Sequence, residues 1–102
     1  MRLVLTRYRS AFATLDVNAV EALWPSVNSR ALRNAFDQLE SQRFDFGCQL
    51  HVTGARANVV CGGTSEFVPA VGSRKPRVEP RDWIFYLARV DDTWVIERVE
   101  SR

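Results

Sequence analysis

A mirrored alternation of apolar and polar residues on either side of Gly54 constrains this chain's fold more than any other feature. Apolar residues occupy every second position from Phe44 to Val52, and again from Ala57 to Cys61. A period of two is typical of a strand with one buried face. With Gly54–Ala55 as a two-residue turn, apolar residues face apolar residues, and a slip by one position would break the match. The sequence therefore predicts an antiparallel hairpin in this register.

The same register places Cys48 directly opposite Cys61. Opposed residues in an antiparallel pair have Cα atoms roughly 4.5–5.5 Å apart, which is within reach of a disulfide. The alternative is two buried thiols that pack as small hydrophobes, and a reducing cytosol favours it. No metal site is expected, because one His and two Cys on adjacent strands do not reproduce a zinc-binding spacing.

A second hairpin is predicted near the C-terminus, with Asp91–Asp92 as its turn and a loop over 72–80 before it. This turn pairs Val90 with Thr93, Leu87 with Ile96, and Tyr86 with Glu97. Both faces are apolar, although an antiparallel strand with one solvated face should be polar on that face. One face carries Trp83, Phe85, Leu87, Trp94 and Ile96, and the other carries Ile84, Tyr86, Ala88, Val90, Val95 and Val99. We therefore expect something to cover the second face.

The first forty-two residues show the spacings of three and four that are typical of amphipathic helices. One helix is predicted from Leu3 to Leu15. A second is capped by Asp16 and stopped by Pro25, and a third runs from Asn28 or Ser29 to about Gln42. Three helices followed by a four-strand antiparallel meander predict an α+β domain.

With 102 residues, the chain is long enough for one domain, residues 1–102. No N-cap residue precedes the first helix, so we expect a domain excised from a longer chain. The net charge of +2 does not indicate a nucleic-acid partner, and no apolar run approaches the ~20 residues of a membrane span. The cellular compartment stays open: cytoplasmic by default, extracytoplasmic if a longer parent chain crosses a membrane.

The order of elements and several local patterns resemble the nuclear transport factor 2-like superfamily, also called SnoaL-like domains. The carrying residues are Tyr8 to Asp16, Ala22-Leu23-Trp24-Pro25, Leu32 and Phe36 of the third helix, and the hairpin from Trp83 to Ile96. The chain is most similar to the short domains at the C-terminal ends of bacterial serine/threonine kinase chains. This resemblance implies that the helices sit in the mouth of a curved sheet, a cystatin-like cone around a cavity. Members include isomerases, hydratases, ligand binders and association domains, so the fold alone does not decide the function.

An isomerase-like member would need an acid or base that projects into the cone cavity. The strand pattern places no carboxylate or histidine there, because Asp45 and His51 project outward. The cavity candidates are Tyr8, Trp24, Trp83, Trp94 and Arg98. Tyr8 and Arg98 together could orient a carboxylate ligand, whereas the alternative for Tyr8 is a core residue with a solvated hydroxyl. No catalytic residue is assigned, and no cofactor is expected, because Gly62–Gly63 precedes no helix.

The patterns and the resemblance together predict a non-catalytic association or small-ligand-sensing domain, and the resemblance implies attachment to a bacterial signalling kinase. A homodimer through the outer sheet face would cover its second apolar stripe, Val60, Ile84, Tyr86, Ala88, Val95 and Val99. Two alternatives to a dimer stay open for the stripe: a bulge that turns Val95 and Val99 inward, and a parent-chain segment that covers the face. The ligand would be small and apolar or a carboxylate. The alternative function is a small-molecule enzyme of the SnoaL-like or isomerase type acting in the cavity.

Overall fold

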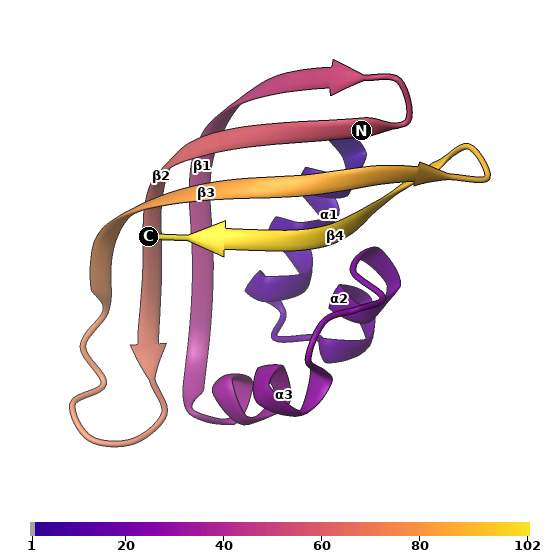
Figure 1. Ribbon diagram of the computed structural model, residues 1–102. Coiled ribbons are helices and arrows are strands. Elements are labelled where there is room, and N and C mark those ends of the chain that lie inside the picture. The colour runs from indigo at the N-terminus through magenta and orange to yellow at the C-terminus, as the bar shows by residue number, and fades with distance from the viewer. Residues whose placement is uncertain (1) are drawn as a thin grey trace.

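Three helices precede four strands in the computed structural model, which describes residues 2–102. The elements are α1 (Arg2–Ala13), α2 (Val17–Leu23), α3 (Ser29–Asp37), β1 (Leu39–Thr53), β2 (Arg56–Pro69), β3 (Arg77–Val90) and β4 (Thr93–Ser101). The strands form one antiparallel sheet in the order β1-β2-β3-β4. All three helices lie on the concave side of this curved sheet (Figure 1). The predicted α+β architecture, three helices on a four-strand meander, is confirmed.

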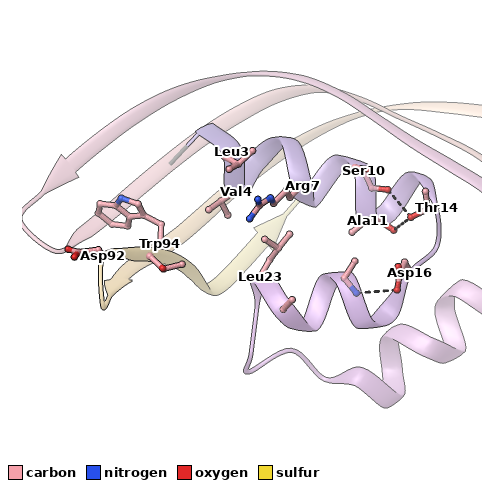
Figure 2. A pocket seen from close by; sticks show the side chains of 13 residues that line it. Leu3, Val4, Arg7, Ser10, Ala11, Thr14, Asp16, Leu23, Asp92 and Trp94 are labelled. Atoms are coloured by element: carbon pink, nitrogen blue, oxygen red, sulfur yellow. Dashed lines mark hydrogen bonds between the residues drawn. The ribbon is translucent and has the colours of Figure 1, made fainter.

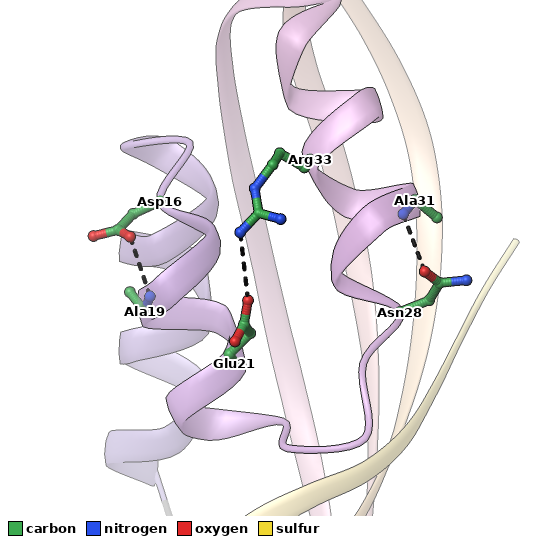
Figure 3. Close-up of polar contacts among 6 residues, drawn as sticks. All are labelled: Asp16, Ala19, Glu21, Asn28, Ala31 and Arg33. Carbon is green, nitrogen blue, oxygen red and sulfur yellow. Dashed lines mark hydrogen bonds and ion pairs between the residues drawn. The ribbon is translucent and has the colours of Figure 1, made fainter.

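The two short helices begin at the residues expected to cap them. The Asp16 carboxylate accepts a hydrogen bond from the Ala19 amide at 3.1 Å, and the Asn28 side chain accepts one from the Ala31 amide at 3.1 Å (Figure 3). The Arg33 guanidinium lies 3.9 Å from the Glu21 carboxylate and links α3 to α2. Each cap satisfies a backbone amide in the first turn of its helix, so α2 and α3 can begin directly after the turns that precede them.

The predicted end of the third helix at Gln42 is wrong. Helix α3 ends at Asp37, and β1 begins at Leu39, which pairs with Pro69 of β2. An apolar residue such as Leu39 satisfies a helical stripe and a strand face equally well. Backbone pairing with β2, a partner distant in sequence, therefore decides between the two conformations.

The first hairpin has the predicted register. Thr53 pairs with Arg56, Leu50 with Val59, and Cys48 with Cys61, around a turn in which Gly54 has a φ of 61°. The Cys48 and Cys61 Cα atoms lie 4.1 Å apart, and the two sulfur atoms are joined in a disulfide. The structure thus contains the disulfide and not the two free thiols that a reducing cytosol favours.

The sheet curves strongly along β1, β2 and β3 (Figure 1). At Gly63 the backbones of β1 and β2 come so close that a Cβ atom would lie 1.9 Å from the Asp45 carbonyl oxygen. Only glycine fits there, because any other side chain would overlap the neighbouring backbone. The pairing continues without interruption past Gly62 and Gly63, so these residues permit a bend and not a bulge.

A bulge in β4 changes the predicted register of the second hairpin. Val90 pairs with Thr93 and Leu87 with Ile96 as expected, but Tyr86 pairs with Arg98, not with Glu97. Glu97 is the additional residue of the bulge. Its carbonyl accepts a hydrogen bond from the Ser26 hydroxyl at 3.2 Å, which compensates for a ladder partner lost at the bulge. Every residue beyond Glu97 consequently faces the opposite side from the one predicted.

The predicted loop over 72–80 is too long, because β3 already begins at Arg77. Pro80 pairs with Thr64 and Glu79 with Ser65 inside the sheet. The prolines and charged residues of this segment are typical of a loop, so the sequence pattern did not indicate the strand. Ser65 lies on the helix-facing side of β2, so the register puts Glu79 and Arg81 on that side of β3 as well.

The core lies between the concave sheet face and the helices. Its largest fully buried side chains are Trp83, Phe85, Leu87 and Ile96, and Tyr8 and Phe12 of α1 pack against them or their neighbours. Helix α1 packs on β1 and α2, while α3 packs on α2 and β1. Within residues 2–102, no helix combines the length and the apolar character that crossing a membrane requires.

Candidate functional site

The centre of the cone is filled by aromatic rings. Trp83 is 1% exposed and Phe85 is not exposed at all. The ring centroids of Tyr8 and Phe85 are 4.9 Å apart, and those of Phe44 and Trp83 are 5.2 Å apart, both in edge-to-face arrangements. Of the expected cavity residues, Tyr8 and Trp83 belong to this packed layer. The place where a ligand would lie in an open cone is occupied by the protein's own side chains.

Trp24 and Trp94, the other two aromatic candidates, lie at the margin of the core. Each is half-buried and packs against core residues, Trp24 at the C-terminal end of α2 and Trp94 beside the β3–β4 turn. The structure therefore does not bring the three tryptophans into one cavity.

The polar groups on the inner side are few and lie at one end of the sheet. Burial raises the pKa of the Tyr8 phenol well above its ordinary value, and the positive charge of Arg81 offsets only part of that shift. Ser65 is completely buried, and its hydroxyl oxygen has no hydrogen-bond partner among the described residues. Glu79 pairs with Ser65 across the ladder and lies 3.9 Å from Arg81. Of these groups, sequence reasoning named Tyr8 but not Ser65 as an inner polar residue, and it assigned Glu79 to a loop.

This inner polar group offers little chemistry for general acid–base catalysis. A buried phenol with a raised pKa stays protonated at neutral pH, and the Glu79 carboxylate is half exposed and paired with Arg81. A general base must reach the substrate proton within hydrogen-bond distance. Tyr8, Ser65, Glu79 and Arg81 line neither the groove of the outer face nor the cleft between α1 and α2 described below.

Arg98 is not at the cavity rim, and this correction follows from the β4 bulge. Its guanidinium lies over the outer face of the sheet, 4.3 Å from the centre of the Tyr86 ring, and forms an ion pair with Glu100. The Tyr86 hydroxyl donates a hydrogen bond to the same carboxylate at 3.3 Å. Tyr8 and Arg98 are therefore on opposite sides of the sheet and cannot hold one ligand together.

The outer face still carries an apolar stripe, although it is shorter than predicted. Val60 is 47% exposed, while Ile84, Tyr86 and Val95 are half-buried and Ala88 is buried. Val99 does not belong to it, because the bulge turns Val99 inward opposite Phe85, where it packs against the core. Val95 remains on the outer face as the partner of Ala88. We call the remaining five residues the outer stripe.

A groove of about 550 Å³ runs beside the outer stripe. Gly47 and Gly62, which pair with each other, form its floor, and the absence of side chains there creates the depression. Val60 and Ile84 belong to both the stripe and the groove wall, and Asp82, Glu100 and Arg102 complete the rim. The outer face thus combines apolar area, a hollow and charges of both signs.

A cavity larger than this groove, with a volume of about 640 Å³, lies elsewhere, between α1, α2 and the β3–β4 turn. We call it the helix cleft. Its walls include Val4, Arg7 and Ala11 of α1, Ala19 and Leu23 of α2, and Trp94 of β4 (Figure 2). Of these residues, sequence reasoning named only Trp94 as a cavity candidate. The only signal for the others is a cluster of alanines on α1 and α2, whose small side chains leave space.

The described residues offer no evident metal centre. Within residues 2–102, no group of three or more His, Cys, Asp or Glu side chains is placed so that it could hold a metal ion.

Neither a protein-family model nor a curated protein matches this sequence, whereas solved structures match its fold closely. A proposed dehydratase of the NTF2-like family from Streptomyces avermitilis shares 15% identity at a TM-score of 0.83, over 97% of this chain and 90% of that one. A proposed scytalone dehydratase from Novosphingobium aromaticivorans shares 13% identity at a TM-score of 0.80, over 99% and 79% of the two chains.

A third similar structure points to another kind of role. A proposed calcium/calmodulin-dependent protein kinase type II association domain from Thiobacillus denitrificans shares 10% identity at a TM-score of 0.74, over 96% of this chain and 90% of that one. The chain therefore has the NTF2-like fold that the sequence resemblance implied. Enzymes and association domains both use this fold, so the residues on its faces must decide the function.

Proposed function

We propose that this chain is a non-catalytic association domain that forms a homodimer through the outer face of its sheet, with a secondary capacity to bind a small ligand. The observation that carries the proposal is the contrast between the two sheet faces. Aromatic rings fill the inner face, where an enzyme with this fold would need open space beside an acid or base. The outer face leaves an apolar stripe and a groove without a covering element.

A second copy of the same chain suits this face better than a partner of strong charge. The rim carries Asp82 and Glu100 together with Arg98 and Arg102, so its charges are mixed. In a two-fold contact each patch meets its own copy, which requires such a self-complementary mixture. Val60 projects next to a groove with a glycine floor, so the Val60 side chain of one copy can enter the groove of the other.

The similarity to a kinase-association domain supports the proposal that this chain is an association domain. A domain of this type would bring two copies of a longer signalling chain together. Attachment to a bacterial kinase is the context that the sequence resemblance implies. Expression of the domain fused to a reporter kinase would test whether association alone changes autophosphorylation.

The dimer is best tested with two matched valines. Val60 on the outer face is 47% exposed, and Val52, which faces the inner side next to the turn of the first hairpin, is 54% exposed. We expect Val60→Glu to convert a dimer into a monomer in size-exclusion chromatography with light scattering, and Val52→Glu to leave the mass unchanged. Equal effects of both substitutions would contradict the proposed interface.

Tyr86→Glu is the second interface variant. Because Tyr86 also contacts Arg98 and Glu100 within the chain, its circular dichroism must match that of the wild type before its mass is interpreted. Loss of the fold in this variant would identify Tyr86 as a structural residue, and the two valine variants would then decide the question alone.

A further inference from the structure

We propose that the helix cleft binds a small aromatic carboxylate, with the carboxylate on Arg7 and the ring beside Trp94. The inference deepens the ligand-binding half of the proposed function and is independent of the dimer. The cleft lies on the helix side of the molecule, whereas the proposed interface is on the outer face of the sheet.

The size and walls of the helix cleft suit a ligand of this class. Its volume of about 640 Å³ falls within the roughly 300–1,000 Å³ that is usual for small-molecule sites. Val4 and Leu23 are buried and provide an apolar floor. Ala11, Ala19 and Ala22 face the space with single methyl groups, so the gap between α1 and α2 is not closed by longer side chains.

Arg7 supplies the specific polar group. Within the described part of the chain it forms no ion pair, while the neighbouring Arg9 lies near Asp45 at 3.9 Å. Figure 2 shows the Arg7 side chain extending from α1 toward α2, close to Val4 and Leu23. A guanidinium offers five N–H donors in a planar fork that matches a carboxylate in two parallel hydrogen bonds. An unpaired arginine over an apolar floor therefore favours an anionic ligand with an apolar body.

Two carboxylates also line the helix cleft and have to be considered. One oxygen of the Asp16 carboxylate accepts the Ala19 amide hydrogen bond as the cap of α2. Asp92 is an exposed residue of the β3–β4 turn. Neither of them forms an ion pair with Arg7. A cationic ligand would use Asp16 or Asp92, so a cationic probe discriminates between recognition by Arg7 and recognition by these carboxylates.

Trp94 provides the apolar and aromatic surface at the other side of the cleft. It is half-buried, and Figure 2 shows its indole ring at the β3–β4 turn. An indole face packs favourably against a second aromatic ring in an offset or edge-to-face arrangement. A bicyclic ring between Trp94 and Leu23 with its carboxylate on Arg7 would use all three features of the cleft.

The test is a titration of the ¹⁵N-labelled chain with three probes that share one ring: 2-naphthoate, neutral 2-naphthamide and cationic 2-naphthylmethylammonium. We expect 2-naphthoate to shift amide signals of α1, α2 and the β3–β4 turn in a saturable way. The amide and the cation should bind at least about tenfold more weakly, because each lacks the charge that Arg7 recognises. The Trp94 indole signal, assigned with Trp94→Phe, should move with 2-naphthoate.

Two substitutions on the same helix provide the matched comparison. Arg7→Gln should weaken 2-naphthoate binding about tenfold and leave 2-naphthamide binding unchanged, while Arg2→Gln, an exposed residue outside the helix cleft, should change neither. Ala22→Leu should weaken both probes by filling the space. Equal affinity for the three probes, no saturable binding at millimolar concentration, or shifts centred on Val60 and Ile84 would each overturn the inference.

The outcome can be separated from that of the proposed dimer by repeating the titration on Val60→Glu. Unchanged 2-naphthoate affinity in this variant is the expected result, because Val60 lies on the outer face. Loss of binding in Val60→Glu with an intact fold would contradict a site that is independent of the interface.

Discussion

Reduction of the Cys48–Cys61 disulfide should lower the stability of the domain without changing its fold. The two residues are 13 positions apart, so the bond closes a loop of about 14 residues in the unfolded chain. The loss of loop-closure entropy then corresponds to about 3 kcal/mol at 25 °C. For a domain of about 100 residues, each 1 kcal/mol shifts the melting temperature by roughly 4–8 °C. We therefore expect reduction to lower the melting temperature by roughly 12–24 °C.

The folded state should survive reduction because the register does not depend on the disulfide. Leu50 faces Val59 and Val52 faces Ala57 on the buried side of the hairpin, and the ladder extends to both ends of β1. A shift by one residue would turn the half-buried Leu50 and the buried Ala57 and Val59 to the outer face. The expected loss of stability therefore arises mainly in the unfolded state, which the disulfide restricts.

The assay is urea denaturation followed by circular dichroism, with and without a phosphine reductant. The matched control is the double variant Cys48→Ala/Cys61→Ala, in which the reductant should have no effect. A thiol count under denaturing, non-reducing conditions checks that the disulfide is present at the start. A difference below about 0.5 kcal/mol between the oxidised and reduced protein would refute the reasoning, and so would a reduced protein that does not fold.

Three further predictions concern single residues. Burial raises the folded-state pKa of Tyr8, so the folded chain keeps the phenol proton above pH 10 while the unfolded chain releases it. The free energy of unfolding should therefore fall by about 1.4 kcal/mol between pH 9 and 11. Denaturation of Tyr8→Phe should show a smaller fall over the same pH range. Trp83→Ala should cost about 3–5 kcal/mol in urea denaturation, and Trp24→Ala clearly less, because Trp83 is buried and Trp24 only half-buried; equal costs would contradict this placement. Asp92→Gly should raise stability by about 0.5–1 kcal/mol, since Asp91 and Asp92 have φ values of 50° and 62° that favour glycine; a thermal melt that shows destabilisation would contradict the turn geometry.

The two hairpins show which parts of the fold the sequence could predict. In the first hairpin one face is apolar and the other polar, so a single register satisfies the pattern and the prediction is confirmed. In the second hairpin both faces are apolar. An additional residue in one strand reverses the facing of the residues after it, and the alternation pattern gives no sign of this when both faces are apolar. The bulge residue Glu97 makes two tertiary contacts, a hydrogen bond from Ser26 and an ion pair with Arg56 at 3.0 Å. Neither partner is close to Glu97 in the sequence.

The candidate sites were predictable only in part for the same physical reason. The outer stripe follows from strand alternation, so most of its residues are correctly placed, and only Val99 is moved by the bulge. The helix cleft depends on how the β3–β4 turn lies relative to α1 and α2, which no local period determines. Arg7 lies off the apolar stripe of α1, and sequence reasoning therefore gives it no role beyond solvation.

Homodimer formation through the outer stripe is the central claim, and the mass of the unmodified chain in solution tests it most directly. Sedimentation equilibrium over a range of about 1–500 µM would give the mass without any substitution or probe. We predict a concentration-dependent rise from the chain mass of 11.6 kDa to twice that value, with no larger species. A mass that stays at 11.6 kDa at the highest concentration would contradict the claim.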